Sequence, residues 1–377
     1  MDADHWDALF GAAGLTGVRE AFSGGEPVVV HGARDRLPHW MHHESLRSAA
    51  ALCATYSGRI LHGRRDRGPR STLIERGSAT DLLAAGEALY LPDIDKIIYE
   101  SIDWIINFEK CLGIPKGSAR VTAWVAPAGE GTALHLDAED VISVQLSGRK
   151  TFEVAEPAAL PFPVGFQYGP GIPAAADLYP QAAGGFPDPT PAQFTSLELE
   201  PGSVLVLPRG HWHRTRCSEV SLSLSIVTAP PTRMDWALGM LRHGALQDAR
   251  WRQPLYGAPT VDQRTQIATG FAALVRHLAE GPGDWAWCDT TALQRVPSVT
   301  LDPEDPSHLI DHYDGTRRPV AATPLMAAVL RWLGSDTSVF TVAQARTAVG
   351  AGVEVALEGL IQNGMLYRWP GSIVRPL

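Results

Sequence analysis

The stretch GTALHLD at residues 131–137, followed by DVISVQLSGRKTF at residues 140–152, decides the fold of this chain. Short apolar runs that are separated by turn residues, here Ser147 and Gly148, are typical of β-strands. Between about residue 120 and residue 229, runs of this kind follow one another at short intervals. They lie at residues 133–137, 141–146, 151–154, 203–207 and 220–227. This series predicts an antiparallel β-sandwich or barrel.

The residues around this β-rich region have a different character. Residues 1–115 give mixed signals, with a short strand pattern at 26–31 and helical spacing of apolar residues at 97–112. Residues 157–191 hold nine prolines and five glycines. We therefore expect an irregular loop laid over the barrel at 157–191. The first domain is predicted to span residues 1–230.

The pattern becomes helical after Pro230-Pro231, and we assign residues 231–312 to a helical region. Thr260 and Gln263 have the spacing of a capping box at the start of a helix. One apolar face of this helix is then formed by Ile267, Phe271, Leu274 and Leu278. Periodicity alone leaves open whether this face packs within the chain or against a second copy.

Residues 313–377 predict a winged-helix-like domain. Thr323-Pro324 opens one helix, a second follows Thr341, a third covers 353–363, and residues 365–369 form a strand pattern. Helix, helix, helix, strand is the order typical of a winged helix. The third helix carries Glu354 and Glu358 and no lysine or arginine. A DNA-binding helix needs lysine or arginine side chains to contact the DNA phosphates. We therefore expect a packing or protein-interaction module and no DNA binding.

Composition restricts the class of protein further. The chain has 377 residues, of which 45% are hydrophobic and 19% charged, so it is not a mostly disordered chain. Its formal net charge of -9 gives no general attraction to nucleic acid or to an acidic membrane. No apolar run reaches the roughly 18 residues that a membrane span needs, and the four cysteines are scattered. We expect a soluble, cytoplasmic protein that makes no membrane contact.

Three residues of the β-rich region have the spacing of metal ligands. His135 and Asp137 are two apart, which places both side chains on one face of a strand. His213 follows the predicted buried strand at 203–207. In a chain with 13 histidines a chance His-x-Asp is common, but the later histidine at a strand end supplies a third ligand. Two imidazoles and one carboxylate are the facial triad of non-haem Fe(II) oxygenases.

Lys150 is predicted to point into the barrel. It shares its face of the strand with Phe152 and Val154, while Thr151 and Glu153 face the other way. A buried lysine needs a partner, and a cosubstrate that bears a carboxylate would provide one. The alternative is a lysine at the surface. The alternating serines of 220–227, namely Ser221, Ser223 and Ser225, either line the pocket or face solvent.

These stretches, together with LPRGHWH at residues 207–213, resemble the Jumonji-C (JmjC) cupin oxygenases. The QLSGRK run at 145–150 is most similar to the ribosomal-oxygenase branch of that family. The resemblance implies an α+β chain with a double-stranded β-helix, or jelly-roll, followed by a helical dimerisation region and a winged helix. It implies as well that the protein forms a homodimer. It also implies that His135, Asp137 and His213 hold Fe(II). Lys150 would then pair with the distal carboxylate of 2-oxoglutarate, with Thr132 adding a hydroxyl group.

The activity implied by the resemblance is hydroxylation coupled to the oxidative decarboxylation of 2-oxoglutarate by O2. The chain departs from the family at Leu136, at Thr151-Phe152 and in the proline-rich insertion, and these differences touch the substrate side more than the metal side. Three hypotheses follow. The protein hydroxylates a side chain of a protein or peptide, it hydroxylates a small molecule or biosynthetic peptide, or it is a non-enzymatic cupin scaffold or regulator.

Overall fold

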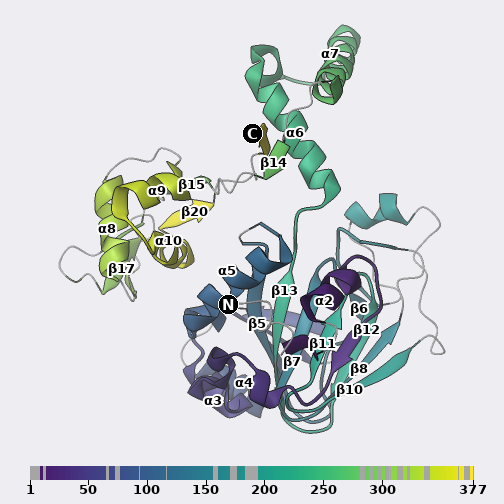
Figure 1. Ribbon diagram of the computed structural model, residues 1–377, viewed down its shortest axis with the longest axis vertical. Helices are drawn as coiled ribbons and strands as arrows, with labels where there is room; N and C mark the ends of the chain where they lie inside the picture. Colours follow the sequence, from purple (N-terminus) through teal and green to yellow (C-terminus); the bar gives the residue numbers. More distant parts are fainter. Residues whose placement is uncertain are drawn as a thin grey trace. The chain divides into compact units, whose positions relative to one another are not determined.

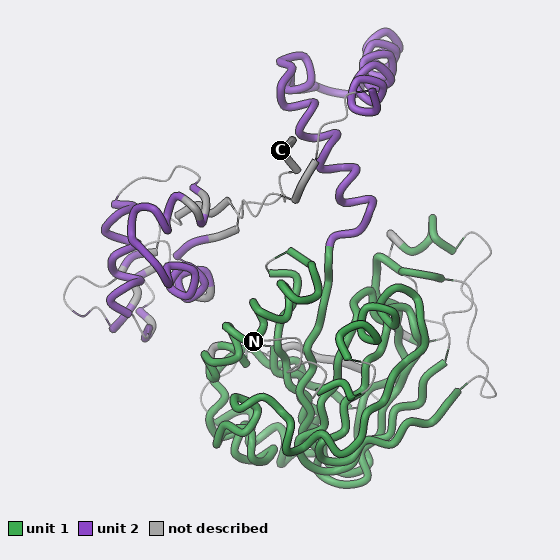
Figure 2. The backbone as a smooth tube through the Cα atoms, viewed as in Figure 1, with its two compact units in different colours: residues 1–230 green, residues 231–377 purple. Residues whose placement is uncertain are grey.

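In the computed structural model the chain divides into two compact units, residues 1–230 and residues 231–377 (Figure 2). Each unit is described by itself. The structure describes residues 9–11, 14–64, 68–72, 77–92, 94–115, 117–155, 160–169, 176–182, 194–280, 285–287, 292–295, 299–301, 305, 307–311, 317–320, 323–334, 340–363, 365–368 and 374–376. Among these residues, no helix is both long enough and apolar enough to cross a membrane.

The first unit is built on two antiparallel sheets (Figure 1). The larger sheet has the order β1 (Val28–Val30), β11 (Val204–Leu207), β7 (Asp140–Ser147), β13 (Ser221–Thr228), β5 (Ala119–Ala126), β4 (Ala88–Leu91), β2 (Ile60–Arg64) and β3 (Gly68–Thr72). The smaller sheet has the order β10 (Thr195–Leu199), β8 (Lys150–Ala155), β12 (Trp212–Cys217), β6 (His135–Leu136) and β9 (Gln167–Tyr168). The predicted antiparallel arrangement is confirmed, and the larger sheet also recruits β1 to β4 from the region with mixed signals.

The larger sheet is buried on both faces, and its two faces differ in chemistry. Ile142, Val144 and Leu224 belong to a hydrophobic core that also includes Leu52 and Phe108. These last two lie on helices α3 (Ala49–Thr55) and α5 (Glu100–Leu112); α2 (Gly14–Phe22) and α4 (Ser78–Ala84) contribute to the same core. The alternate residues of β7 and β13 are largely polar and buried, among them Ser143, Ser223 and Ser225. The sheet therefore offers an apolar face to the helices and a polar face to the space between the sheets.

The turn between β7 and β8 requires a glycine. Gly148 has a φ of +69°, and a Cβ atom there would overlap the backbone carbonyl oxygen of Val220. No side chain fits that position, and few would adopt that backbone conformation. The turn sets the register of β8 and so the direction of Lys150 two residues later.

The proline-rich stretch is only partly described. Residues 160–169 and 176–182 are anchored by the buried side chains of Leu160 and Leu178. They include β9 and a 3-10 helix at Ala176–Gln181, so the expectation of no regular structure at 157–191 is wrong for these two short elements. The strand β9 forms because it adds to β6, with His135 paired to Tyr168. The rest of the predicted loop lies outside the described residues.

The second unit begins with two helices, α6 (Arg233–Gln247) and α7 (Val261–Glu280). The predicted capping box is present, because the backbone N–H of Gln263 donates to the Thr260 hydroxyl and the Gln263 side chain accepts from Thr260 N–H. Of the predicted apolar face, Leu274 and Leu278 approach Gly244 of α6, whereas Ile267 and Phe271 are exposed.

The assignment of 231–312 as helical is wrong beyond Glu280. The described residues there form strands, namely β14 (Trp285–Trp287), β15 (Ala292–Arg295), β16 (Val299–Leu301) and β17 (His308–Asp311). Their partners include β21 (Val374–Pro376), β18 (Arg317–Pro319) and β20 (Leu366–Arg368). Strands of three or four residues show no usable periodicity, and two of the partners lie more than 70 residues away in the sequence.

The last helices follow the predicted order. They are α8 (Pro324–Leu333), α9 (Val342–Val349) and α10 (Val353–Gln362), followed by β20. Their apolar sides enclose a core that includes Met326, Val329, Leu357 and Leu360. A three-stranded sheet of the order β19 (Phe340–Thr341), β15 and β20 accompanies the helices.

Candidate metal centre

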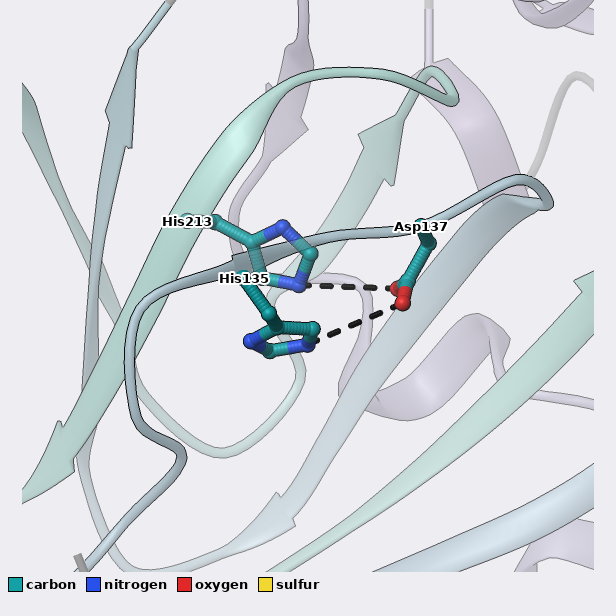
Figure 3. Close-up of side chains that lie close together, drawn as sticks. All are labelled: His135, Asp137 and His213. Atoms are coloured by element: carbon teal, nitrogen blue, oxygen red, sulfur yellow. Dashed lines mark ion pairs between the residues drawn. The ribbon is translucent and has the colours of Figure 1, made fainter. Parts of the chain in front are cut away.

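Three side chains of the smaller sheet converge on one point (Figure 3). His135 lies on β6, Asp137 follows that strand directly, and His213 lies on β12, where it pairs with His135 across the sheet. Asp137 Oδ1 is 3.7 Å from His135 Nε2, and Asp137 Oδ2 is 3.6 Å from His213 Nε2. Three potential ligand atoms, one from each residue, lie within 4.8 Å of one another. The structure thus brings together the three residues that the sequence nominated as ligands.

The backbone fixes which imidazole nitrogen is offered to a metal. Nδ1 of His135 lies 2.7 Å from the carbonyl oxygen of Ala133, and Nδ1 of His213 lies 3.0 Å from that of His211. Each Nδ1–H can therefore donate to a carbonyl, which leaves both Nε2 lone pairs facing Asp137. His211 is buried with Nδ1 near the Pro208 carbonyl and is not part of the cluster.

Burial shapes the electrostatics of these ligands. It lowers the pKa of His213 below its usual range, and the nearby His135 acts in the same direction. Burial raises the pKa of Asp137, although the charges of His135 and Arg120 oppose this shift. A neutral imidazole is the form that binds a metal. Two imidazole nitrogens and one carboxylate oxygen on a common centre fit a divalent transition metal such as Fe(II).

Lys150 lies in the same cavity and points inward. Its side chain is 5% exposed, and Nζ donates to the hydroxyl of Ser223 at 2.5 Å. Burial lowers the pKa of Lys150, an effect that Cys217 partly offsets. Among the described residues, no carboxylate forms an ion pair with this ammonium group, so none of them supplies its counter-charge. An anion that entered the cavity would find one unneutralised cation there.

The cavity has a volume of about 330 Å³ and is lined by all five predicted site residues, including Thr132. The Thr132 hydroxyl lies 3.0 Å from that of Thr215, whose oxygen also accepts from Thr132 N–H at 2.8 Å. Of the three serines, Ser225 lines the cavity and Ser223 contacts Lys150. Ser221 is also buried and accepts from the side chain of Gln145.

Four cavity residues carry no sequence signal that we recognised. Arg120 forms a bidentate ion pair with Glu139, at 2.8 and 2.7 Å. The rings of Tyr90 and Trp124 lie against each other with centroids 4.8 Å apart. Arg120 and Trp124 share one parity along β5, so alternation could have placed them together, but Tyr90 lies on β4 and Glu139 directly before β7.

Two facing antiparallel sheets with a His-Asp-His cluster between them define a cupin-type metalloprotein. Residues 104–236 match the family model of the JmjC domain. The chain therefore carries a JmjC domain, as the resemblance predicted, and the cupin fold of the first unit is confirmed.

Several known proteins are similar to this chain. YxbC of Bacillus subtilis, described as an uncharacterized protein, is 26% identical over 242 residues, which cover 60% of this chain and 72% of YxbC. Lysine-specific demethylase 8 of Xenopus tropicalis is 31% identical over 120 residues, which cover 30% of this chain and about a quarter (26%) of the frog protein. A structure of the Escherichia coli ribosomal oxygenase YcfD with cobalt and 2-oxoglutarate is 16% identical, with a TM-score of 0.44 over 91% of this chain and 95% of that chain.

Proposed function

We propose that the protein is an Fe(II)- and 2-oxoglutarate-dependent dioxygenase that hydroxylates an amino-acid side chain of a protein or peptide. The observation that carries this proposal is one cavity that holds both a three-ligand cluster and a buried ammonium group with no carboxylate partner in the described part of the chain. The ligand set suits Fe(II), and the ammonium suits a dicarboxylate cosubstrate. The JmjC domain at residues 104–236 favours the same class of enzyme.

Each site residue then has a defined task. His135, Asp137 and His213 hold Fe(II) through Nε2, a carboxylate oxygen and Nε2. Lys150, steadied by Ser223, pairs with the distal carboxylate of 2-oxoglutarate, and the Thr132 hydroxyl donates to that carboxylate. Bound Fe(II) supplies the oxidising chemistry with 2-oxoglutarate and O2. The burial of His213 and Lys150 keeps water away from the reacting groups.

An anaerobic titration with Fe(II) and 2-oxoglutarate tests this assignment through the visible metal-to-ligand charge-transfer band. We expect a band in the unmodified protein, none in Asp137→Ala or His213→Ala because iron is not held, and weaker 2-oxoglutarate binding with retained iron in Lys150→Ala. Arg149→Ala is the matched control, because Arg149 directly precedes Lys150 in the sequence but its side chain is 61% exposed to solvent. Iron binding without a band would indicate another metal chemistry, and no iron binding would favour the scaffold hypothesis.

A polypeptide is the substrate that we propose. Phe166 lines the cavity and is 46% exposed, which supports an opening to solvent beside this residue. The similar frog protein is named as a demethylase specific for lysine, a residue of proteins. We expect a polypeptide to gain the mass of one oxygen atom only with both Fe(II) and 2-oxoglutarate, and not with His213→Ala. Mass spectrometry of a treated protein digest measures this, and turnover of small molecules alone would contradict it.

The second unit is proposed to form a homodimer through α6 and α7 and to end in a winged-helix-like domain. Neither helix has a buried residue, and the exposed side chains include Leu238 and Phe271. The helices α8 to α10 with the sheet β19-β15-β20 support the winged-helix proposal. The acidic residues of α10 favour protein contacts over DNA. A cytoplasmic location and membership of the ribosomal-oxygenase branch stay predictions.

A further inference from the structure

We propose that the side chain presented for oxidation is uncharged and is held against the ring pair Tyr90–Trp124. This inference rests on the proposed function, since it assumes that Fe(II) and 2-oxoglutarate occupy the inner part of the cavity. It names the chemical class of the substrate group, and it follows from the charges and rings that line the outer part.

The first observation is that Arg120 and Glu139 neutralise each other. Their side chains are joined by two hydrogen bonds, from the two terminal nitrogens of Arg120 to the two carboxylate oxygens of Glu139. Burial disfavours the charged form of Arg120, but the hydrogen bonds and charge of Glu139 outweigh it and raise the pKa of Arg120. Both side chains line the cavity, and as a bidentate ion pair they offer no net charge to a substrate.

The remaining charges of the cavity wall also have counter-charges. Arg64 lies 3.3 Å from Glu87, which lies 3.4 Å from His62 as well. Lys150 and Asp137 face the two groups that the proposed function places inside, a carboxylate and a divalent metal. The charges of Fe(II) and of the 2-oxoglutarate dianion are equal and opposite. With both bound, the charged side chains that are described in the cavity wall balance completely.

The second observation is a row of cross-strand neighbours on the cavity face of the larger sheet. Leu61 on β2 pairs with Tyr90 on β4, which pairs with Trp124 on β5. All three line the cavity, and the two ring planes make an angle of 49°. The side chain of Tyr90 also lies near Arg120 and acts to raise its pKa. A substrate in this part of the cavity would contact the two rings and the side chain of Leu61. The guanidinium of Arg120 lies at the edge of the same surface.

These two observations select against a charged substrate group. A cation would gain attraction from the rings, but it would lie near Arg120 without a free carboxylate. An anion would meet Glu139 and Asp137 without a free cation. A charged group that is moved from water into such a cavity without its own partner is strongly disfavoured. An uncharged side chain with an apolar or planar body does not have this cost of moving a charge out of water, and it gains contact with the rings.

Binding of isosteric probe pairs tests the inference. The probes are N-acetyl N-methylamides of citrulline and arginine, of glutamine and glutamate, and of norleucine and lysine. Each is titrated into the full chain with 2-oxoglutarate and diamagnetic Zn(II), and saturation-transfer NMR measures binding. We expect the uncharged member of each pair to bind more tightly, by about tenfold or more. A parallel sample with Fe(II) in place of Zn(II) is checked for the charge-transfer band. If the band is missing, the proposed function has failed; if the band is present, the probe data test the inference alone.

Three variants make the outcome specific. Tyr90→Ala is expected to weaken every uncharged probe, whereas Tyr99→Ala, an exposed tyrosine on another element, leaves them unchanged. Glu139→Gln leaves Arg120 without its carboxylate and is expected to shift the preference from glutamine towards glutamate. The inference is overturned if charged probes bind as tightly as their neutral isosteres to the unmodified protein. It is equally overturned if neither Tyr90→Ala nor Glu139→Gln alters probe binding while the band persists.

Discussion

A buried ammonium group without a carboxylate partner is costly, and Lys150 is such a group among the described residues. Its hydrogen bond to Ser223 and the ring of Phe152, 5.6 Å from Nζ, compensate only part of the lost hydration. A residue with this cost and no structural benefit fits a role in binding an anion. A carboxylate that enters the cavity would remove this cost.

Replacement of Lys150 by methionine is therefore expected to stabilise the fold while it weakens cosubstrate binding. The thioether fills the same space without a charge, and the gain in unfolding free energy should be about 1–3 kcal/mol at neutral pH. Thermal unfolding with and without 2-oxoglutarate and a divalent metal checks both effects. The ligands should raise the melting temperature of the unmodified protein more than that of the variant. A variant less stable than the parent would contradict this account.

The same residue gives a pH dependence with a defined sign. Burial lowers the folded-state pKa of Lys150 below the ordinary 10.5. The folded state therefore binds this proton less tightly than the unfolded state, and the penalty is complete below the lowered pKa. It declines as the pH rises from that value towards 10.5. The stability advantage of Lys150→Met should shrink over this pH range, as measured by denaturant unfolding at a series of pH values; an advantage that grows with pH would refute it.

At the scale of elements, a buried ion pair ties together the segments that carry the metal ligands. Asp140, 1% exposed at the start of β7, accepts from the backbone N–H of Arg209 and from its guanidinium. The next residue, Gly210, donates its N–H to the carbonyl of Asp137. The turn before His213 is thus held directly on the segment that bears Asp137.

We expect Arg209→Met to lower the free energy of unfolding by about 3–5 kcal/mol, because it leaves the Asp140 carboxylate buried and unpaired. Arg214→Met is the matched control, since Arg214 forms a similar pair with Glu153 but both side chains are about one-third exposed. That change should cost less than about 1 kcal/mol. Chemical denaturation measures both, and equal losses in the two variants would show that burial does not decide the effect.

Gly131 lets the segment before His135 approach β12. A Cβ atom at this position would overlap the carbonyl oxygen of Thr215, so Gly131→Ala must displace Thr132 from its contact with the Thr215 hydroxyl. We expect a loss of about 1–3 kcal/mol in stability and weaker 2-oxoglutarate binding in the charge-transfer titration. Gly169→Ala is the control. A Cβ atom at Gly169 would lie 3.5 Å from its nearest neighbour, the carbonyl oxygen of Leu134, so this variant should behave like the parent. Unchanged titration of Gly131→Ala would remove Thr132 from the proposed site.

The elements also show what the sequence could and could not predict. Alternation along one strand predicted that His135 and Asp137 share a face and that Lys150 points inward, because both patterns are local. The ring pair of Tyr90 with Trp124 depends on the pairing of β4 with β5, and the ion pair of Arg120 with Glu139 depends on where the sheet places the start of β7 relative to β5. The order of strands in the sheet depends on interactions along the whole chain, so no local sequence pattern predicts these contacts. The strands after Glu280 escaped prediction for the same reason.

At the scale of the whole molecule, the two units differ in how they bury apolar surface. The first unit encloses its apolar residues between sheet and helices and keeps a polar face for the cavity. In the second unit, α6 and α7 have no buried residue, although Leu274 and Leu278 contact α6 at Gly244. Two helices with exposed apolar side chains such as Leu238 and Phe271 have apolar surface available for another copy of the chain.

The homodimer proposed for these helices predicts a specific effect of charge. Phe271→Asp places a carboxylate in the exposed apolar face of α7 and should shift the protein from dimer to monomer, because an unpaired charge is not tolerated at the centre of an apolar interface. Val355→Asp makes the same exchange at an exposed valine of α10 and should leave the dimer intact. Sedimentation velocity measures the mass of each species. A monomeric parent, or a Phe271→Asp variant that associates as tightly as the parent, would exclude α7 as the interface, and the exposed face would then have to be assigned to a different partner.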